Sequence, residues 1–220
     1  MSRRPPETPR EPWLTDGPRA AYDHDRDAPA AVLFDRDGTL VEDVPYNGDP
    51  ALVRLTPTAR AAVDAVRAAG VPVGVVSNQS GVARGLLTRE QVDAVRRRVE
   101  ELLGPFAVWA ICPHGPGDGC GCRKPAPGLV LAACERLGVP AGRAAVIGDI
   151  GADMDAARAA GARGVLVPTP VTRAEEIEAA DTVAPDLLTA VRLVLGPRSG
   201  ARPAAAVCAP GTGAGEGERR

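Results

Sequence analysis

Aromatic residues and histidine are scarce in this sequence. Phe, Trp and Tyr together make up 3% of the 220 residues, and there are two histidines. We therefore expect a core of Val, Leu, Ile and Ala. His24 lies in a polar stretch without periodicity and is expected to be solvated, which leaves His114 as the one histidine available for chemistry.

The chain also lacks long apolar runs and a strong excess of one charge. No stretch approaches the ~18 apolar residues of a membrane span, and the first thirty residues contain no apolar core typical of a secretory signal. The formal net charge of -2 favours neither nucleic acid nor a membrane surface as a partner. We therefore expect a cytoplasmic protein, and its five cysteines then favour metal binding or free thiols over disulfides.

Hydrophobic periodicity is confined to the middle of the chain. Residues 1–28 are rich in Pro, Arg and Asp, and residues 197–220 in Gly, Pro and Ala, so we expect disorder in both. In residues 29–196, strand-like and helix-like runs alternate, which predicts one α/β domain with a parallel sheet and helices on both faces. Strands are expected at 31–34, 72–76, 106–111, 144–147, 164–167 and 182–183, and helices at 127–137, 152–160, 174–179 and 185–195, with two more opened by caps at Thr56 and Thr88.

Polar residues follow three of the apolar strands, at the point where each strand ends. Asp35 and Asp37 follow the first, Ser77 to Gln79 the second, and Asp149 the fourth. One such cluster could be an ordinary turn, because Asp and Gly are common turn residues. The carboxyl ends of parallel strands share one edge of the sheet, where ligands bind, so three clusters indicate a site.

The chemistry of these clusters suits a phosphate ester and a divalent cation. The Ser77–Ser80 stretch offers hydroxyls, amides and backbone N–H groups that can cradle a phosphate. Asp149, supported by Asp153, adds a further carboxylate, and such oxygen donors favour Mg²⁺. Arg123 and Lys124 can add positive charge for a transferring phosphoryl group.

A second potential metal site lies between the third and fourth strands. Its ligands are three thiols and one imidazole within eleven positions: Cys112, His114, Cys120 and Cys122. Structural zinc takes four such ligands in a tetrahedron, and the glycines between them allow a short loop to fold around a metal. Reactive or adventitious thiols are the alternative interpretation.

Together these motifs resemble a known family. Asp35-x-Asp37-Gly38-Thr39, Ser77-Asn78, Lys124 and Gly148-Asp149-x-x-x-Asp153 resemble, in this order, the four motifs of the haloacid dehalogenase superfamily of phosphatases. The stretches SNQSGVARG, CPHG and CGCRKPAPG, at 77–85, 112–115 and 120–128, are similar to its D,D-heptose 1,7-bisphosphate phosphatase and histidinol-phosphatase group. The resemblance spans about residues 31–195 and implies a capless, Rossmann-like fold with a zinc-binding loop.

The resemblance also implies a role for each matching residue. Asp35 would attack phosphorus as the nucleophile, and Asp37 would be the general acid and base. Ser77 and Lys124 would contact the phosphoryl oxygens. The Mg²⁺ ligands would be the Asp35 and Asp149 carboxylates and the Asp37 backbone carbonyl. The implied substrate-binding residues are Asp43, Tyr46, Ser77, Asn78, Gln79, Ser80, Arg123 and Lys124.

The substrate is less sharply defined by the motifs. The expected reaction is removal of the 7-phosphate of a heptose 1,7-bisphosphate by a monomer. The family often has Lys after the fourth-motif aspartate, where this chain has Ile150, and this loss of a cation weakens the case for a bisphosphate. Histidinol-phosphate hydrolysis therefore stays open, as does a catalytically idle, zinc-stabilised protein that binds a phosphosugar or similar phosphate ester.

Overall fold

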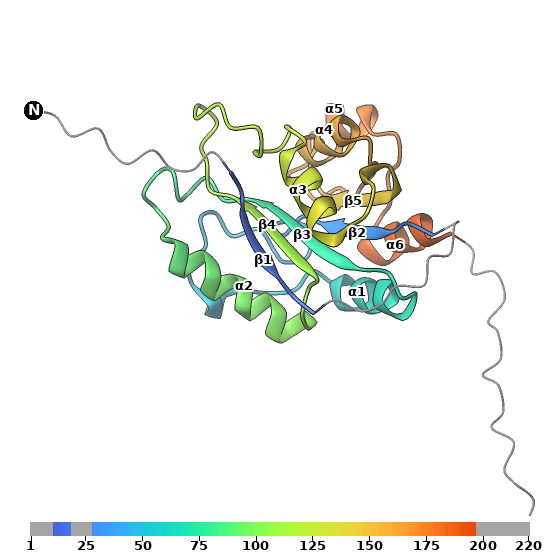
Figure 1. Cartoon of the computed structure of the whole chain (residues 1–220), viewed down its shortest axis with the longest axis horizontal. Helices are drawn as coiled ribbons and strands as arrows, with labels where there is room; N and C mark the ends of the chain where they lie inside the picture. Colours follow the sequence, from blue (N-terminus) through green and yellow to red (C-terminus); the bar gives the residue numbers. More distant parts are fainter. Residues whose placement is uncertain (1–10, 19–27, 197–220) are drawn as a thin grey trace, which may run out of the picture.

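A mixed six-stranded sheet is the centre of the computed structural model, which describes residues 11–18 and 28–196 (Figure 1). The strand order is β1-β4-β3-β2-β5-β6. All neighbours pair in parallel except β1 and β4, which are antiparallel. The strands are β1 (Trp13–Asp16), β2 (Ala31–Phe34), β3 (Val73–Asn78), β4 (Val108–Cys112), β5 (Ala144–Gly148) and β6 (Arg163–Leu166).

Helices cover both faces of this sheet, as predicted. They are α1 (Ala59–Ala68), α2 (Arg89–Leu103), α3 (Gly128–Leu137), α4 (Gly151–Ala160), α5 (Ala174–Ala179) and α6 (Leu187–Leu195), with 3-10 turns η1 (Pro50–Leu52) and η2 (Ala141–Arg143). Val32 and Phe34 of β2 pack with α1, α2 and α6, whereas Ala31 and Leu33 face α3 and α4. The fully apolar strand is thus explained by burial on both sides.

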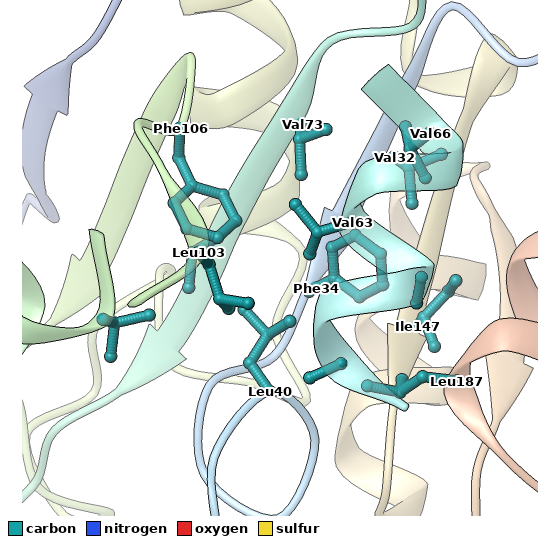
Figure 2. Close-up of a cluster of buried hydrophobic side chains, with 14 of the residues drawn as sticks. Val32, Phe34, Leu40, Val63, Val66, Val73, Leu103, Phe106, Ile147 and Leu187 are labelled. Atoms are coloured by element: carbon teal, nitrogen blue, oxygen red, sulfur yellow. The ribbon is translucent and has the colours of Figure 1, made fainter. Parts of the chain in front are cut away.

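The larger apolar layer consists of aliphatic side chains around a few aromatic rings. Figure 2 shows Val63 of α1 beside Phe34 of β2, with Val66 near Val32 and Leu187 of α6 near Ile147 of β5. The rings of Phe106 and Trp109 pack edge to face, with their centroids 5.3 Å apart. These contacts fix β2 between the helices, and therefore fix the position of the residues that follow it.

The chain order places β2 at a topological switch point. From β2 the chain continues to β3 and β4 on one side, and then returns to β5 and β6 on the other. In parallel sheets, such a reversal leaves a crevice outside the carboxyl ends of the strands. The residues after β2, β3 and β5 therefore share one edge.

The N-terminal segment differs from the expectation of disorder over residues 1–28. Trp13 pairs with Ile111 and Asp16 with Val108, which adds β1 to the edge of the sheet. The Arg89 guanidinium lies 4.8 Å from the Trp13 ring centroid. Residues 1–10, 19–27 and 197–220, and with them His24 and most of the expected disordered segments, lie outside the described residues.

Of three local predictions, one is confirmed and two need correction. The cap at Thr88 is confirmed, with a reciprocal Gln91 contact at the start of α2. The cap at Thr56 is wrong, because α1 begins at Ala59 and the Thr56 hydroxyl instead donates to the Thr39 carbonyl at 2.6 Å. The strand expected at 182–183 is a single bridge between Leu166 and Val183.

Within the described residues, none of the helices combines the length and the apolar character needed to traverse a lipid bilayer.

Candidate active site

Three carboxylates converge at the edge where β2 and β5 end. Asp35 follows β2, Asp149 follows β5 and Asp153 lies in the first turn of α4. One oxygen from each lies within 4.8 Å of the others, and all three residues are less than 10% exposed. Lys124 Nζ lies among them and donates at 2.6 Å to Oδ1 of Asp35 and to Oδ1 of Asp153.

This arrangement leaves an excess of buried negative charge. Burial, opposed by Lys124 and reinforced by the neighbouring aspartates, raises the pKa of Asp35 to about 8. Burial, together with Asp153, likewise raises the pKa of Asp149 to about 7. Burial disfavours the Lys124 ammonium, but the carboxylates of Asp153 and Asp35 outweigh it and raise its pKa. One ammonium cannot neutralise three carboxylates, so the donor set fits a divalent cation with oxygen ligands.

The turn after β2 is shaped by the Asp149 carboxylate. Gly38 has a φ of +76°, and a Cβ there would lie 2.3 Å from Asp149 Oδ2, so only glycine fits. Thr39 donates its hydroxyl to Asp149 Oδ1 at 3.1 Å, and Thr172 donates to the Asp149 backbone carbonyl at 2.6 Å. The predicted D-x-D-G-T turn is therefore built against the strand end that carries the third aspartate.

Asp37 is held by neighbours that sequence reasoning did not assign to it. The guanidinium of Arg36, which is 2% exposed, donates from Nε to Asp37 Oδ1 at 3.0 Å and from Nη2 to Oδ2 at 2.8 Å. Gln79 Nε2 donates to Asp37 Oδ2 at 2.9 Å and to Ser77 Oγ at 3.0 Å. A chain of hydrogen bonds thus connects the end of β2 with the end of β3.

Asn78 has a different partner from the one expected. Its side-chain amide donates to the Lys124 carbonyl at 3.0 Å and accepts from the Lys124 N–H at 3.1 Å. Lys124 Nζ also donates to the Val76 carbonyl at 2.9 Å. Asn78 therefore fixes the backbone that delivers the lysine, and its amide is already engaged in this protein contact.

A cleft of about 350 Å³ opens at this edge of the sheet. Most of the predicted site residues line it: Asp35, Asp37, Asp43, Tyr46, Asn78, Gln79, Ser80, Arg123, Lys124 and Asp149. Ser77 does not line it directly and is 1% exposed. Ile150 does line it, so an aliphatic side chain occupies the position where the family often has lysine.

Tyr46, which lines the cleft, contacts a cation that the sequence did not single out for this place. Arg84 donates from Nη1 to the Tyr46 hydroxyl at 2.6 Å, and its guanidinium lies 5.5 Å from the ring centroid. Tyr46 has a φ of +52°, which side-chain-bearing residues rarely adopt. The SNQSGVARG stretch contains Arg84, but only the fold brings it to Tyr46.

The cysteines and the histidine also converge as predicted. Cys112 Sγ lies 3.4 Å from His114 Nδ1, 3.8 Å from Cys120 Sγ and 3.3 Å from Cys122 Sγ. These distances are too long for a disulfide. The Cys112–Cys120 distance matches the about 3.8 Å expected between sulfurs of a tetrahedral site with zinc–sulfur bonds of about 2.3 Å, and the other two distances are shorter. The hydrogen bond between Cys122 and Cys112 lowers the pKa of the Cys112 thiol and raises that of the Cys122 thiol, so in the metal-free cluster Cys112 is the sulfur that ionises first.

Comparison with known proteins agrees with this geometry. Residues 121–190 match the model of the HAD-hydrolase-like family. A D-glycero-beta-D-manno-heptose-1,7-bisphosphate 7-phosphatase of Mesorhizobium japonicum is 42% identical over 149 residues, which cover 62% of this chain and 69% of the relative.

Two solved structures share the fold. A D,D-heptose 1,7-bisphosphate phosphatase of B. bronchiseptica, crystallised with magnesium and phosphate, has a TM-score of 0.67 and 28% identity, over 75% of this chain and 98% of that one. A HAD-like phosphatase of Mesorhizobium loti has a TM-score of 0.66 and 30% identity, over 88% of this chain and 99% of that one. The motifs, the fold and these similarities agree: the chain belongs to the haloacid dehalogenase superfamily, in the group of the heptose 1,7-bisphosphate phosphatases.

Proposed function

We propose that this protein is a Mg²⁺-dependent phosphatase that removes the 7-phosphate of D-glycero-D-manno-heptose 1,7-bisphosphate. The observation that carries the proposal is the cleft in which Asp35, Asp37, Asp149 and Lys124 meet. The relatives named for this activity support the choice of substrate. The substrate, the site roles and both metals are assigned to this chain by inference from its own residues and from its relatives.

In the first step, the Asp35 carboxylate attacks the phosphorus of the 7-phosphate. Lys124 engages Oδ1 of Asp35, while no described residue hydrogen-bonds Oδ2, which is therefore available for attack. The bond from phosphorus to the sugar oxygen breaks, and Asp37 donates a proton to that oxygen as it leaves. The product of this step is an aspartyl-phosphate and the free sugar hydroxyl.

The second step returns the enzyme to its starting state. Asp37 now accepts a proton from a water molecule, which attacks the phosphorus of the aspartyl-phosphate. The bond between Asp35 and phosphorus breaks, and inorganic phosphate leaves. Lys124 and the Ser77 hydroxyl contact the phosphoryl oxygens in both steps, and Gln79 links Ser77 to Asp37.

Mg²⁺ fits the carboxylates of Asp35 and Asp149 and the backbone carbonyl of Asp37, because the excess of buried negative charge there requires a cation. When bound, it offsets the repulsion between an anionic nucleophile and an anionic phosphate. Asp153 already engages Lys124 Nζ at 2.6 Å and the Ile150 N–H at 3.3 Å. We therefore assign it the task of positioning Lys124 and not that of a direct ligand.

The zinc site is assigned a structural role. Four protein ligands would fill a tetrahedron and leave no position for substrate. The loop from 113 to 127 contains no helix or strand, and it carries both Arg123 and Lys124. Arg123 Nη1 donates to the His114 carbonyl at 3.4 Å, which ties the cation of the rim to the metal-binding segment. Arg123 is the residue we assign to the phosphate that is not transferred.

Histidinol phosphate is the second candidate substrate, because Ile150 lines the cleft and supplies no cation for a second phosphate. The two are separated by measuring phosphate release with Mg²⁺ from the heptose bisphosphate and from histidinol phosphate. We expect kcat/KM for the heptose bisphosphate to be higher by about 100-fold or more. A preference for histidinol phosphate would refute the substrate assignment, and hydrolysis of neither ester would favour an idle phosphosugar-binding protein.

A further inference from the structure

We propose that Arg36 is a positioning residue that fixes the carboxyl group of Asp37 for proton transfer to the leaving sugar oxygen and from the attacking water. The inference rests on the proposed function, in which Asp37 is the general acid and base. It goes beyond that function by assigning a task to the residue between the two aspartates, which would otherwise only space them.

The contact between Arg36 and Asp37 has two points. Nε and Nη2 of the guanidinium donate to different oxygens of the same carboxylate, at 3.0 and 2.8 Å. A planar fork that engages both oxygens fixes the plane of the carboxylate as well as its position. Gln79 adds a third donor at 2.9 Å on Oδ2. Rotation of the Asp37 side chain would therefore break three hydrogen bonds at once.

The burial of Arg36 is hard to explain by stability alone. Its side chain is 2% exposed, while that of Asp37 is 25% exposed and retains contact with water. Its Nη1 has no hydrogen-bond partner among the described residues, and a buried donor without an acceptor is unfavourable for folding. By contrast, the buried ammonium of Lys124 donates to Asp35, Asp153 and the Val76 carbonyl. A buried ion pair with an unsatisfied donor contributes little to the stability of a fold. The effect of Arg36 on the Asp37 carboxylate therefore explains the burial of Arg36 better than stability does.

The position of the pair also agrees with this task. Both Arg36 and Asp37 line the cleft, and Gln79 extends the chain of hydrogen bonds to Ser77 Oγ at 3.0 Å. The group that transfers protons and the hydroxyl assigned to the phosphoryl oxygens are thus held in one network. Proton transfer depends on small differences in donor–acceptor geometry, and Arg36 controls that geometry without contacting the phosphorus.

The dependence of the rate on the leaving group tests this role. A sugar alkoxide needs a proton from Asp37, whereas p-nitrophenolate leaves without one. In single turnover, which isolates the first step, leaving-group release by Arg36→Met should slow about 100-fold with heptose 1,7-bisphosphate but less than about threefold with p-nitrophenyl phosphate. Hydrolysis of the aspartyl-phosphate, in which Asp37 accepts a proton from water, should slow equally for both esters. KM for both esters should stay within a factor of about two of wild type. Arg36→Lys, which retains the charge but lacks the fork, should show the same selectivity.

Two further variants serve as control and as safeguard. Arg96→Met removes another arginine with two carboxylate partners, Asp93 and Glu100 on α2, away from the cleft, and it should leave both rates unchanged. Gln79→Leu removes only the third donor. It should slow leaving-group release from the sugar ester selectively, by about tenfold in single turnover, and it provides the test if both Arg36 variants fail to fold.

Two results would overturn the inference. Equal losses in the first step with both esters would mean that Arg36 supports the fold or the nucleophile and not the acid. A rise in KM with unchanged kcat would make it a substrate-binding residue. A wild-type protein that hydrolyses neither ester would instead refute the proposed function itself, so the two failures are distinguishable.

Discussion

At the level of residues, the site places three carboxylates around a single ammonium group. Lys124 contacts Asp35 and Asp153 directly, whereas the Asp149 side chain accepts from the Thr39 hydroxyl and contacts no cation among the described residues. The metal-free protein therefore contains carboxyl groups that resist ionisation. A bound cation would stabilise the ionised carboxylates, so metal binding would release protons and depend on pH.

The stability of the metal-free protein should accordingly fall as the pH rises. The pKa values of Asp35 and Asp149 are raised from 3.8 to about 8 and about 7. Between these limits the folded state binds more protons than the unfolded chain, so the free energy of unfolding decreases with increasing pH. In EDTA, Tm should decrease between about pH 5 and about pH 8, and added Mg²⁺ should raise Tm more at the higher pH.

Thermal unfolding of wild type and of Asp149→Asn checks this expectation. The variant has one raised pKa fewer, so its Tm in EDTA should depend less steeply on pH, and differences common to both proteins cancel. Equal slopes for the two proteins, or a Mg²⁺ effect that is larger at low pH, would contradict the assignment of these carboxylates.

The aspartates of this site were predictable from the sequence, but their partners were not. Asp35, Asp37 and Asp149 each follow an apolar run, and that position is visible in the sequence. Arg36 and Thr39 lie in the same motif, but their contacts depend on the directions of their side chains, which the spacing of residues in the sequence does not reveal. Thr172 lies 23 residues from Asp149, and only the return of the chain beside β5 brings it near.

At the level of elements, β4 joins the two expected metal sites. Cys112 ends β4 and is the register partner of Asn78, and the Gln79 N–H donates to the Cys112 carbonyl at 2.7 Å. The segment that follows contains the other three proposed zinc ligands and then Lys124, whose backbone is held by the Asn78 side chain. A change in the metal-binding loop should therefore reach the cleft.

Cys120→Ser tests this connection. It removes one proposed ligand, so zinc content should fall well below one per chain, and the free energy of unfolding should decrease by at least about 2 kcal/mol. Cys134→Ala is the matched control, because Cys134 is buried in α3 outside the cluster, and it should leave the zinc content unchanged. Metal analysis and thermal unfolding provide the measurements. Unaltered zinc content and stability in Cys120→Ser would overturn the structural-zinc assignment.

Most helices and strands of the domain were predicted from the pattern of hydrophobic residues in the sequence, and the exceptions have physical causes. The capping box at Thr88 contains its own partner, Gln91, three residues on, so local sequence defines it. Thr56 is followed by proline and looks like a cap, but its hydroxyl satisfies the Thr39 carbonyl instead. β1 has four residues in a proline-rich and charged segment, and only its pairing with β4 makes it a strand.

At the level of the whole molecule, the fold leaves the cleft covered by loops alone. Between β2 and β3 the chain contains only η1 and α1, so no second domain among the described residues closes over Asp35. Selection of the substrate therefore depends on the rim, where Tyr46 and Arg123 lie. The sheet provides the reaction chemistry, and the loops provide the choice of phosphate ester.

The proposed mechanism depends above all on Asp35 as the nucleophile of a Mg²⁺-dependent phosphatase. Phosphate release from heptose 1,7-bisphosphate should be compared for wild type and Asp35→Asn, with Asp155→Asn as an exposed carboxylate control on α4. We expect Asp35→Asn to lose at least about 1,000-fold in kcat while its zinc content is retained and it remains folded, and Asp155→Asn to match wild type. Undiminished phosphate release by folded Asp35→Asn would contradict the mechanism.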